Sequence, residues 1–328
     1  MTGIVSGNDG ASIVPTKAEL IRRMDIVKNA TEEKDIFDLW GRFSRGQTAE
    51  KIQNDVLSGG TITPISFRPF DSRWTYYSGN SCGWVLWPRE KNTMGHLLAE
   101  PNCPIGANIG LVFCKTSRSF FSPFVSQNII AHRLFSAMCE ITYIAPLYLR
   151  SESGLTGESW TANLNDEAFN KLTQYLSEKP EPIEIFDYVY GILHDPVYCE
   201  KYEQYLCRDF PRVPIINTPE KERDEGEFYV SEELYREYVS AGERLRKLHL
   251  MQIKAPAELA LEPNTPDEME IGAIKYKNGV LQLNANKRIT GISQEVWKYQ
   301  IGGHQVLDKW FKEHKGCLLY TSDAADDL

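Results

Sequence analysis

The stretch that decides the fold is Phe67-Arg68-Pro69-Phe70-Asp71-Ser72-Arg73-Trp74-Thr75-Tyr76-Tyr77. Two arginines stand here among five aromatic residues, and the pattern predicts strands over Ile62–Phe67 and Trp74–Tyr77. Guanidinium groups beside aromatic faces suit a surface that binds phosphates and bases. Aromatic strands with arginines at their edges are also common in protein cores. The stretch by itself therefore leaves a binding role and a packing role open.

The charge around this stretch is basic, although the chain as a whole is acidic. From Gly60 to Arg150 there are eight basic and four acidic residues, whereas the 328-residue chain has a net charge of −9. Fourteen of the 37 aromatic residues also lie in this segment. Non-specific DNA affinity depends on neutralising phosphates, so the overall charge argues against a general nucleic-acid binder. A basic, aromatic lobe on an acidic body is compatible with local DNA contact.

The periodicity of apolar residues predicts an α+β fold in three parts. Residues 1–60 are expected to form a helical lead-in, with helices over Lys17–Asn29, from Thr31 and over Thr48–Leu57. Residues 61–150 form a β-rich lobe of short aromatic and β-branched strands, with one helix near Lys91–Leu98. Residues 151–316 form an acidic, mostly helical lobe. This lobe ends in a hairpin around Lys277-Asn278-Gly279, where Asn-Gly favours a type I′ turn.

Both ends of the chain look unlike the ends of a natural domain. Residues 317–328 resemble the translation of a sequencing-library adapter, so we exclude them from the fold. The start at Met1, followed by a Gly/Ser/Asn-rich turn over Gly3–Gly10, is typical of an internal methionine. We therefore expect a fragment of a longer protein.

Cysteine usage and hydropathy indicate a cytoplasmic protein. The seven cysteines form no CxxC pair, and the six histidines have no metal-ligand spacing. Reduced thiols and no metal are expected. No apolar run approaches the ~18 residues that a membrane-spanning helix needs.

Catalytic motifs are missing from the sequence. Gly79-Asn80-Ser81-Cys82-Gly83 fits the Gly-x-Ser-x-Gly nucleophile pattern, but an extended segment follows it where the motif requires a helix. A hydrolase that uses Ser81 is therefore the least favoured alternative. The chain has neither an Asn/Asp-Pro-Pro-Tyr segment nor a glycine-rich cofactor turn. Whether the protein is an enzyme stays open at this point.

The opening stretch resembles the Arg-Pro-Phe-Asp-x-Arg-Trp-x-Tyr-Tyr segment of the C-terminal target-recognition region of type ISP restriction-modification enzymes and related adenine-N6 DNA methyltransferases. Four further segments resemble the same family in the same order: Ile144–Leu149, Phe186–Tyr198, Asp209–Pro214 and Ile301–Trp310. Two positions depart from the family pattern. Trp87 stands where the family has arginine, and His304 stands where it has tyrosine.

The resemblance implies a DNA target-recognition module that lacks a catalytic domain of its own. Its expected partners are double-stranded DNA and an upstream methyltransferase domain, which would hold S-adenosylmethionine; no cofactor is expected in this chain. The candidate DNA contacts are Arg68, Arg73, Arg89, Lys91, Lys115, Arg118 and Arg133. Arg68 and Arg73 could equally stabilise the hairpin through Asp71. A scaffold that docks onto a partner domain without touching DNA is the main alternative.

Overall fold

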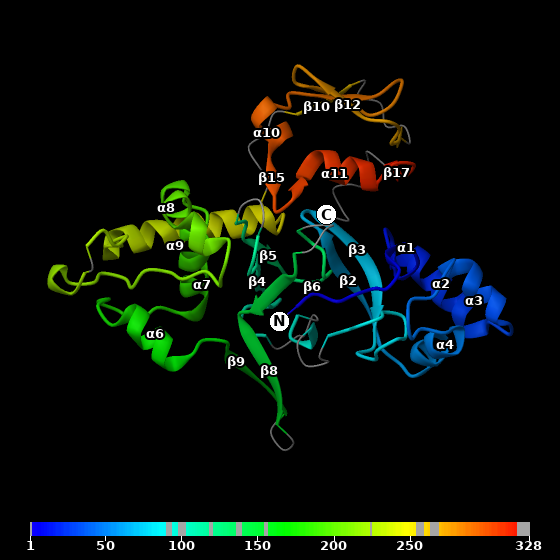
Figure 1. Ribbon diagram of the computed structural model, residues 1–328, viewed down its shortest axis with the longest axis horizontal. Helices are drawn as coiled ribbons and strands as arrows, with labels where there is room; N and C mark the ends of the chain where they lie inside the picture. Colours follow the sequence, from blue (N-terminus) through cyan, green and yellow to red (C-terminus); the bar gives the residue numbers. More distant parts are fainter. Residues whose placement is uncertain are drawn as a thin grey trace. The chain divides into compact units, whose positions relative to one another are not determined.

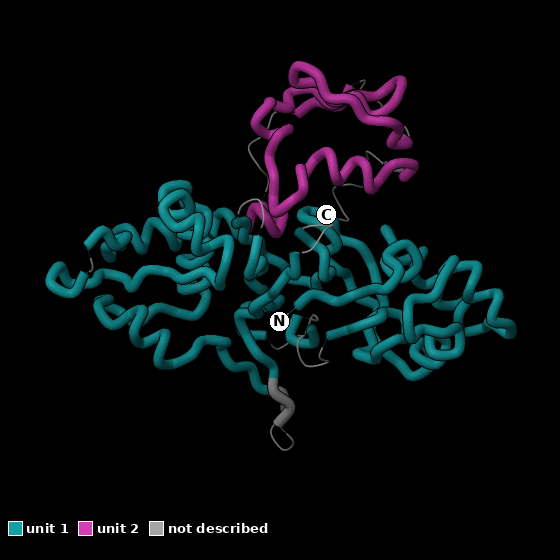
Figure 2. Tube along the Cα trace, viewed as in Figure 1, with its two compact units in different colours: residues 1–246 teal, residues 247–328 magenta. Residues whose placement is uncertain are grey.

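Two compact units make up the chain, residues 1–246 and 247–328 (Figure 2). This boundary differs from the three parts expected from the sequence, because the last part of the chain has a hydrophobic core of its own. The structure, a computed structural model, describes residues 2–89, 94–97, 103–117, 121–135, 140–153, 157–223, 225–253, 259–262 and 269–319. The fold is α+β, as predicted.

The first unit begins with four helices that lie beside a long β-hairpin (Figure 1). The helices are α1 (Asp9–Ser12), α2 (Lys17–Asn29), α3 (Glu33–Trp40) and α4 (Ala49–Leu57). Threonine side chains cap two of them. Thr16 accepts a hydrogen bond from the Glu19 amide at the start of α2, and Thr48 accepts one from the Lys51 amide at the start of α4. These caps explain why both helices begin where the sequence predicts.

The hairpin belongs to a four-stranded sheet of order β1-β3-β2-β6. Its strands are β1 (Ile13–Val14), β2 (Thr61–Arg68), β3 (Asp71–Tyr77) and β6 (Ile129–Ile130). Phe70 closes the β2–β3 turn with a φ of 59°, in the left-handed region. Trp84 is fully buried beside the hairpin, with its ring 5.1 Å from that of Trp40 and 6.0 Å from that of Tyr76. This aromatic contact joins the helices to the sheet.

The rest of the β-rich part consists of a three-stranded sheet and a second hairpin. The sheet has the order β5-β4-β7, from β4 (Gly110–Cys114), β5 (Phe124–Ser126) and β7 (Thr142–Pro146). The hairpin pairs β8 (Tyr148–Ser153) with β9 (Gly157–Ala162). Most of the helix expected near Lys91–Leu98 lies outside the described residues.

Helices of the acidic part pack around a tyrosine-rich core. They are α6 (Asp166–Thr173), α7 (Pro182–Ile192), α8 (Pro196–Leu206), the short 3-10 helix η1 (Glu220–Glu222) and α9 (Glu232–His249). Two glycines let α7 and α9 approach closely: a Cβ on Gly242 would lie 1.9 Å from the Asp187 carbonyl oxygen, and one on Gly191 would lie 2.5 Å from that of Tyr238. A buried ion pair joins the same helices, with Arg246 Nε 2.6 Å from Asp187 Oδ1.

The second unit contains a small sheet and two helices on its own core. The sheet has the order β10-β14-β13-β12, from β10 (Ala260–Glu262), β12 (Lys275–Lys277), β13 (Val280–Gln282) and β14 (Arg288–Thr290). The predicted Asn278-Gly279 turn is confirmed, since both residues have positive φ. The remaining elements are β11 (Met269–Glu270), α10 (Gln294–Lys298), β15 (Gln300–Ile301), β16 (His304–Gln305), α11 (Val306–Glu313) and β17 (Leu318–Leu319).

The expected adapter segment starts at Cys317. In the structure β17 pairs with β11, and residues 320–328 lie outside the described part of the chain. Within the described ranges, the helices are all too short or too polar to cross a membrane.

Candidate nucleic-acid interface

The two arginines of the opening stretch lie in the hairpin rather than projecting from it. Arg73 is buried and forms a bidentate ion pair with Asp71, at 2.9 Å from NH2 to Oδ2 and 3.1 Å from Nε to Oδ1. The guanidinium carbons of Arg68 and Arg73 lie 3.9 Å and 4.2 Å from the centroid of the Phe67 ring. These arginines therefore stabilise the turn through cation–π and ionic contacts.

Arg68 also connects the hairpin to Arg133. Its NH1 group donates to the carbonyl oxygen of Phe67 at 2.8 Å and to that of Arg133 at 3.1 Å. Arg68 is buried, whereas Arg133 is exposed. Arg68 thus fixes the backbone from which the Arg133 side chain projects.

Arg133 lies in a group of exposed or half-buried residues that we name the Arg89–Arg133 cluster: Trp87, Arg89, His132 and Arg133. Trp87 is 48% exposed, and the Arg89 guanidinium lies 5.3 Å from its ring centroid. Burial, together with the charges of Arg89 and Arg133, lowers the pKa of His132 below its ordinary value. The ring is then neutral near pH 7, and the two arginines carry the positive charge of the cluster.

Residues 3–5 hold the two halves of this cluster together. Val5 exchanges backbone hydrogen bonds of 2.9 Å with Trp87, while the Ile4 carbonyl accepts one of 2.8 Å from the His132 amide. Gly3 passes so close to the neighbouring strand that a Cβ there would lie 2.6 Å from Ala131 backbone atoms. The segment expected to be a simple Gly-rich turn therefore includes a structural strand-like connection.

The Gly-x-Ser-x-Gly loop is organised by a buried carboxylate. Asp55 accepts hydrogen bonds from Ser78 Oγ at 2.6 Å, Asn80 Nδ2 at 2.8 Å and the Trp84 amide at 2.8 Å. Ser81 itself is exposed, and turns and bends follow it rather than a helix. This geometry lacks the strand–turn–helix support of a nucleophile elbow. The loop's structural product is the placement of Trp84 and, beyond it, Trp87.

The other basic candidates are scattered. Lys115 is 44% exposed at the end of β4, with its Nζ 3.8 Å from Asp209 Oδ1 and 4.9 Å from the centroid of the Phe210 ring. Lys91 and Arg118 lie outside the described residues. The structure thus brings together Arg89 and Arg133, supported by Arg68, and places Lys115 in a separate contact.

A second basic surface was missed by the sequence analysis. Residues 269–319 contain eight basic and four acidic residues. The strand register aligns Lys275, Gln282 and Arg288 in one row, while the next row, Tyr276, Leu281 and Ile289, packs on the core. The outer face of this sheet is therefore polar and basic. Counting charges over the C-terminal segment alone would have found it.

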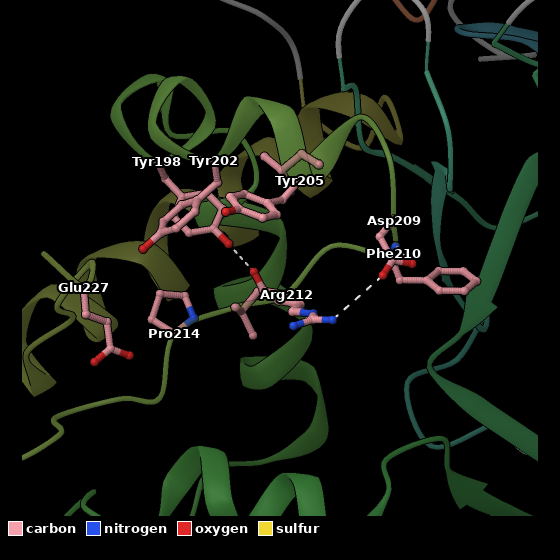
Figure 3. Close-up of a pocket in the computed structure, with 10 residues that line it drawn as sticks. Tyr198, Tyr202, Tyr205, Asp209, Phe210, Arg212, Pro214 and Glu227 are labelled. Carbon is pink, nitrogen blue, oxygen red and sulfur yellow. Dashed lines mark hydrogen bonds and ion pairs between the residues drawn. The ribbon is translucent and has the colours of Figure 1, made fainter. Parts of the chain in front are cut away.

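A pocket of about 460 Å³ lies on α8, away from these arginines (Figure 3). We name it the tyrosine pocket. Tyr198, Tyr202 and Tyr205 form one side of it, and the segment 209–214 and Glu227 complete it. Among the described residues no group of three or more His, Cys, Asp or Glu side chains is arranged to hold a metal ion.

Comparison with known proteins places the chain in a family. Residues 1–327 match the family model of the Type ISP C-terminal specificity domain. The chain belongs to this family. The resemblance inferred from the sequence is therefore confirmed. No curated protein matches the chain.

Solved structures share the fold of this specificity domain. The Type ISP restriction-modification enzyme LlaBIII, bound to DNA, has a TM-score of 0.70 and 16% identity over 99% of this chain. A DrdV–DNA complex has a TM-score of 0.64 and 20% identity over 96%, and a nuclease-deletion mutant of LlaGI with a DNA substrate mimic has 0.64 and 16% over 96%. The chain spans 31%, 21% and 24% of the DrdV, LlaBIII and LlaGI chains, respectively.

Proposed function

We propose that this specificity domain recognises a target sequence in double-stranded DNA for a restriction-modification enzyme that methylates adenine at N6. The observation that carries the proposal is the Arg89–Arg133 cluster, in which an exposed tryptophan and two arginines lie together on a basic lobe. The family supports the proposal, as do the fold relatives, each of which was solved with DNA or a mimic of it.

Within this proposal the arginines have two different roles. Arg89 and Arg133 contact DNA directly, since a guanidinium can donate two hydrogen bonds to a guanine edge, worth roughly 1–3 kcal/mol of discrimination. Arg68 and Arg73 act indirectly, because their groups bind Phe67, Asp71 and the Arg133 backbone. Lys115, and also Lys91 and Arg118, are proposed to contact phosphates, which position the domain without reading sequence.

The acidic helical lobe is proposed to face protein. Residues 157–246 contain ten basic and twenty acidic residues. Such a surface repels DNA phosphates and favours a protein partner. We propose that this partner is a methyltransferase domain, which binds S-adenosylmethionine and performs the chemistry that the present chain lacks motifs for.

Charge reversal in the cluster tests the DNA-binding proposal. We expect Arg89→Glu and Arg133→Glu each to weaken binding to a duplex by about tenfold or more, because each removes a donor and adds repulsion. Equilibrium binding should be measured between about 50 and 200 mM salt, where loss of a phosphate contact lowers the slope of log K against log salt by about 0.9.

Lys28→Glu, on the exposed end of α2, is the matched control, since it makes the same change of charge outside the basic lobe. Its binding should remain within about twofold of the wild type. If Arg89→Glu, Arg133→Glu and Lys28→Glu all bind duplex as the wild type does, the cluster is not the interface and the scaffold alternative is favoured.

A further inference from the structure

The tyrosine pocket has a wall that is built before any ligand arrives. Tyr198, Tyr202 and Tyr205 are spaced i, i+4 and i+7 along α8, so they lie on one face of the helix. The Tyr198 hydroxyl donates to the Arg212 carbonyl, and Tyr202 Oη accepts from the Phe228 amide at 3.2 Å. Figure 3 shows these side chains directed at the segment that runs from Asp209 to Pro214. The hydroxyls of the two inner tyrosines are thus committed to the fold, and the rings are left as flat walls.

The rim of the pocket is unusually exposed for such large side chains. Tyr205 is 74% exposed and Phe210 is 46% exposed, although Leu206 beside them is buried. Exposed apolar surface that adjoins a pocket marks interaction sites, and tyrosine is enriched among residues that dominate binding energy. The pocket volume, about 460 Å³, is within the range of ligand sites. The rim is therefore suited to cover by a ligand.

The charge of the surroundings selects a cation. The helical lobe has twice as many acidic as basic residues, and Asp209 and Glu227 stand at opposite ends of the pocket (Figure 3). Lys115 and Arg212 each lie 3.8 Å from Asp209, which shows that this carboxylate attracts cationic side chains. A nucleic-acid strand would meet the repulsion of the whole lobe.

We propose that the tyrosine pocket binds an extended, arginine-bearing segment of a protein partner. A guanidinium stacks on a tyrosine ring by a cation–π contact, while its methylene stem covers apolar surface. The carboxylates at the two ends favour the cationic head. Aromatic grooves bind extended proline-containing segments well, because such segments lose little entropy on binding. The site is separate from the Arg89–Arg133 cluster and its function does not depend on DNA binding.

Binding of defined peptides to the whole chain tests this proposal. The probes are short fluorescein-labelled peptides of alternating proline and arginine, with lysine or glutamate in place of arginine as comparisons. We expect the arginine peptide to bind, the lysine peptide to bind several-fold more weakly, and the glutamate peptide not to bind. Tyr205→Ala should weaken arginine-peptide binding by about fivefold or more.

Val197→Ala is the matched control, because Val197 is 66% exposed on the same helix but does not line the pocket. It should bind the arginine peptide as the wild type does. Tyr205 is exposed, so its removal should leave the melting temperature and duplex binding unchanged. The proposal is overturned if no arginine peptide binds, if Tyr205→Ala binds it normally, or if single-stranded DNA binds the pocket in competition with it.

Discussion

Replacing Gly242 with alanine should unfold the helical lobe by about 3 kcal/mol, the usual upper range for overpacking a core. The added Cβ would lie 1.9 Å from the carbonyl oxygen of Asp187, which belongs to the backbone of α7 and cannot rotate away. Helices α7 and α9 must therefore separate. In an exposed helix the same substitution is stabilising by up to about 1 kcal/mol, so the expected sign is opposite to that of helix propensity.

Urea unfolding followed by circular dichroism measures this effect. Ser240→Ala, at an exposed position on the same helix, is the control and should change the unfolding free energy by no more than about 0.5 kcal/mol. A Gly242→Ala protein that melts at or above the wild-type midpoint would show that α7 and α9 do not pack in this way.

Replacing Asp71 with alanine should destabilise the protein by about 3–5 kcal/mol, because it leaves the buried Arg73 guanidinium without its carboxylate. The double variant Asp71→Ala/Arg73→Met should recover most of this loss, since an apolar pair can replace a buried ion pair at little cost. Thermal and urea unfolding of the two single variants and the double variant measure the coupling.

The same double variant separates the two interpretations of the opening stretch. If Arg73 stabilises the hairpin, the folded double variant should bind duplex DNA within about twofold of the wild type. A folded double variant that no longer binds DNA would instead make Arg73 a direct contact.

Local signals were sufficient to predict much of the fold. Lys17–Asn29 forms a helix with the predicted bounds, because Thr16 caps it and its apolar residues recur at helical spacing. The Asn278-Gly279 turn was predicted from its two residues, since they tolerate positive φ. These features depend on residues close together in the chain, and such interactions are visible in the sequence.

Features made by distant residues were missed. Strands β1 and β6 have two residues each, too few to show a period of two, and each forms only through pairing with β3 or β2. The Asp187–Arg246 pair joins helices that the sequence presents separately. Gly191 and Gly242 gave no local sign of the close approach that they permit.

The candidate interface was predicted in composition but not in geometry. All of its arginines were singled out, yet Arg68 and Arg73 proved to be buried in ionic and cation–π contacts. The proximity of Arg89 to His132 and Arg133 could not be predicted, because it depends on residues 3–5 lying between their two strands. Trp87, which departs from the family pattern, is the exposed ring beside Arg89.

Selection from a pool of duplexes with randomised sequence tests the central claim most directly. The immobilised chain would be incubated with the pool at about 0.1–0.15 M ionic strength, where exposed charges are substantially screened, and retained duplexes would be sequenced. We expect one defined motif to be enriched, and Arg89→Glu or Arg133→Glu to reduce its enrichment at particular positions. Retention of duplexes with no preferred motif, or no retention at all, would contradict the assignment of sequence recognition to this domain.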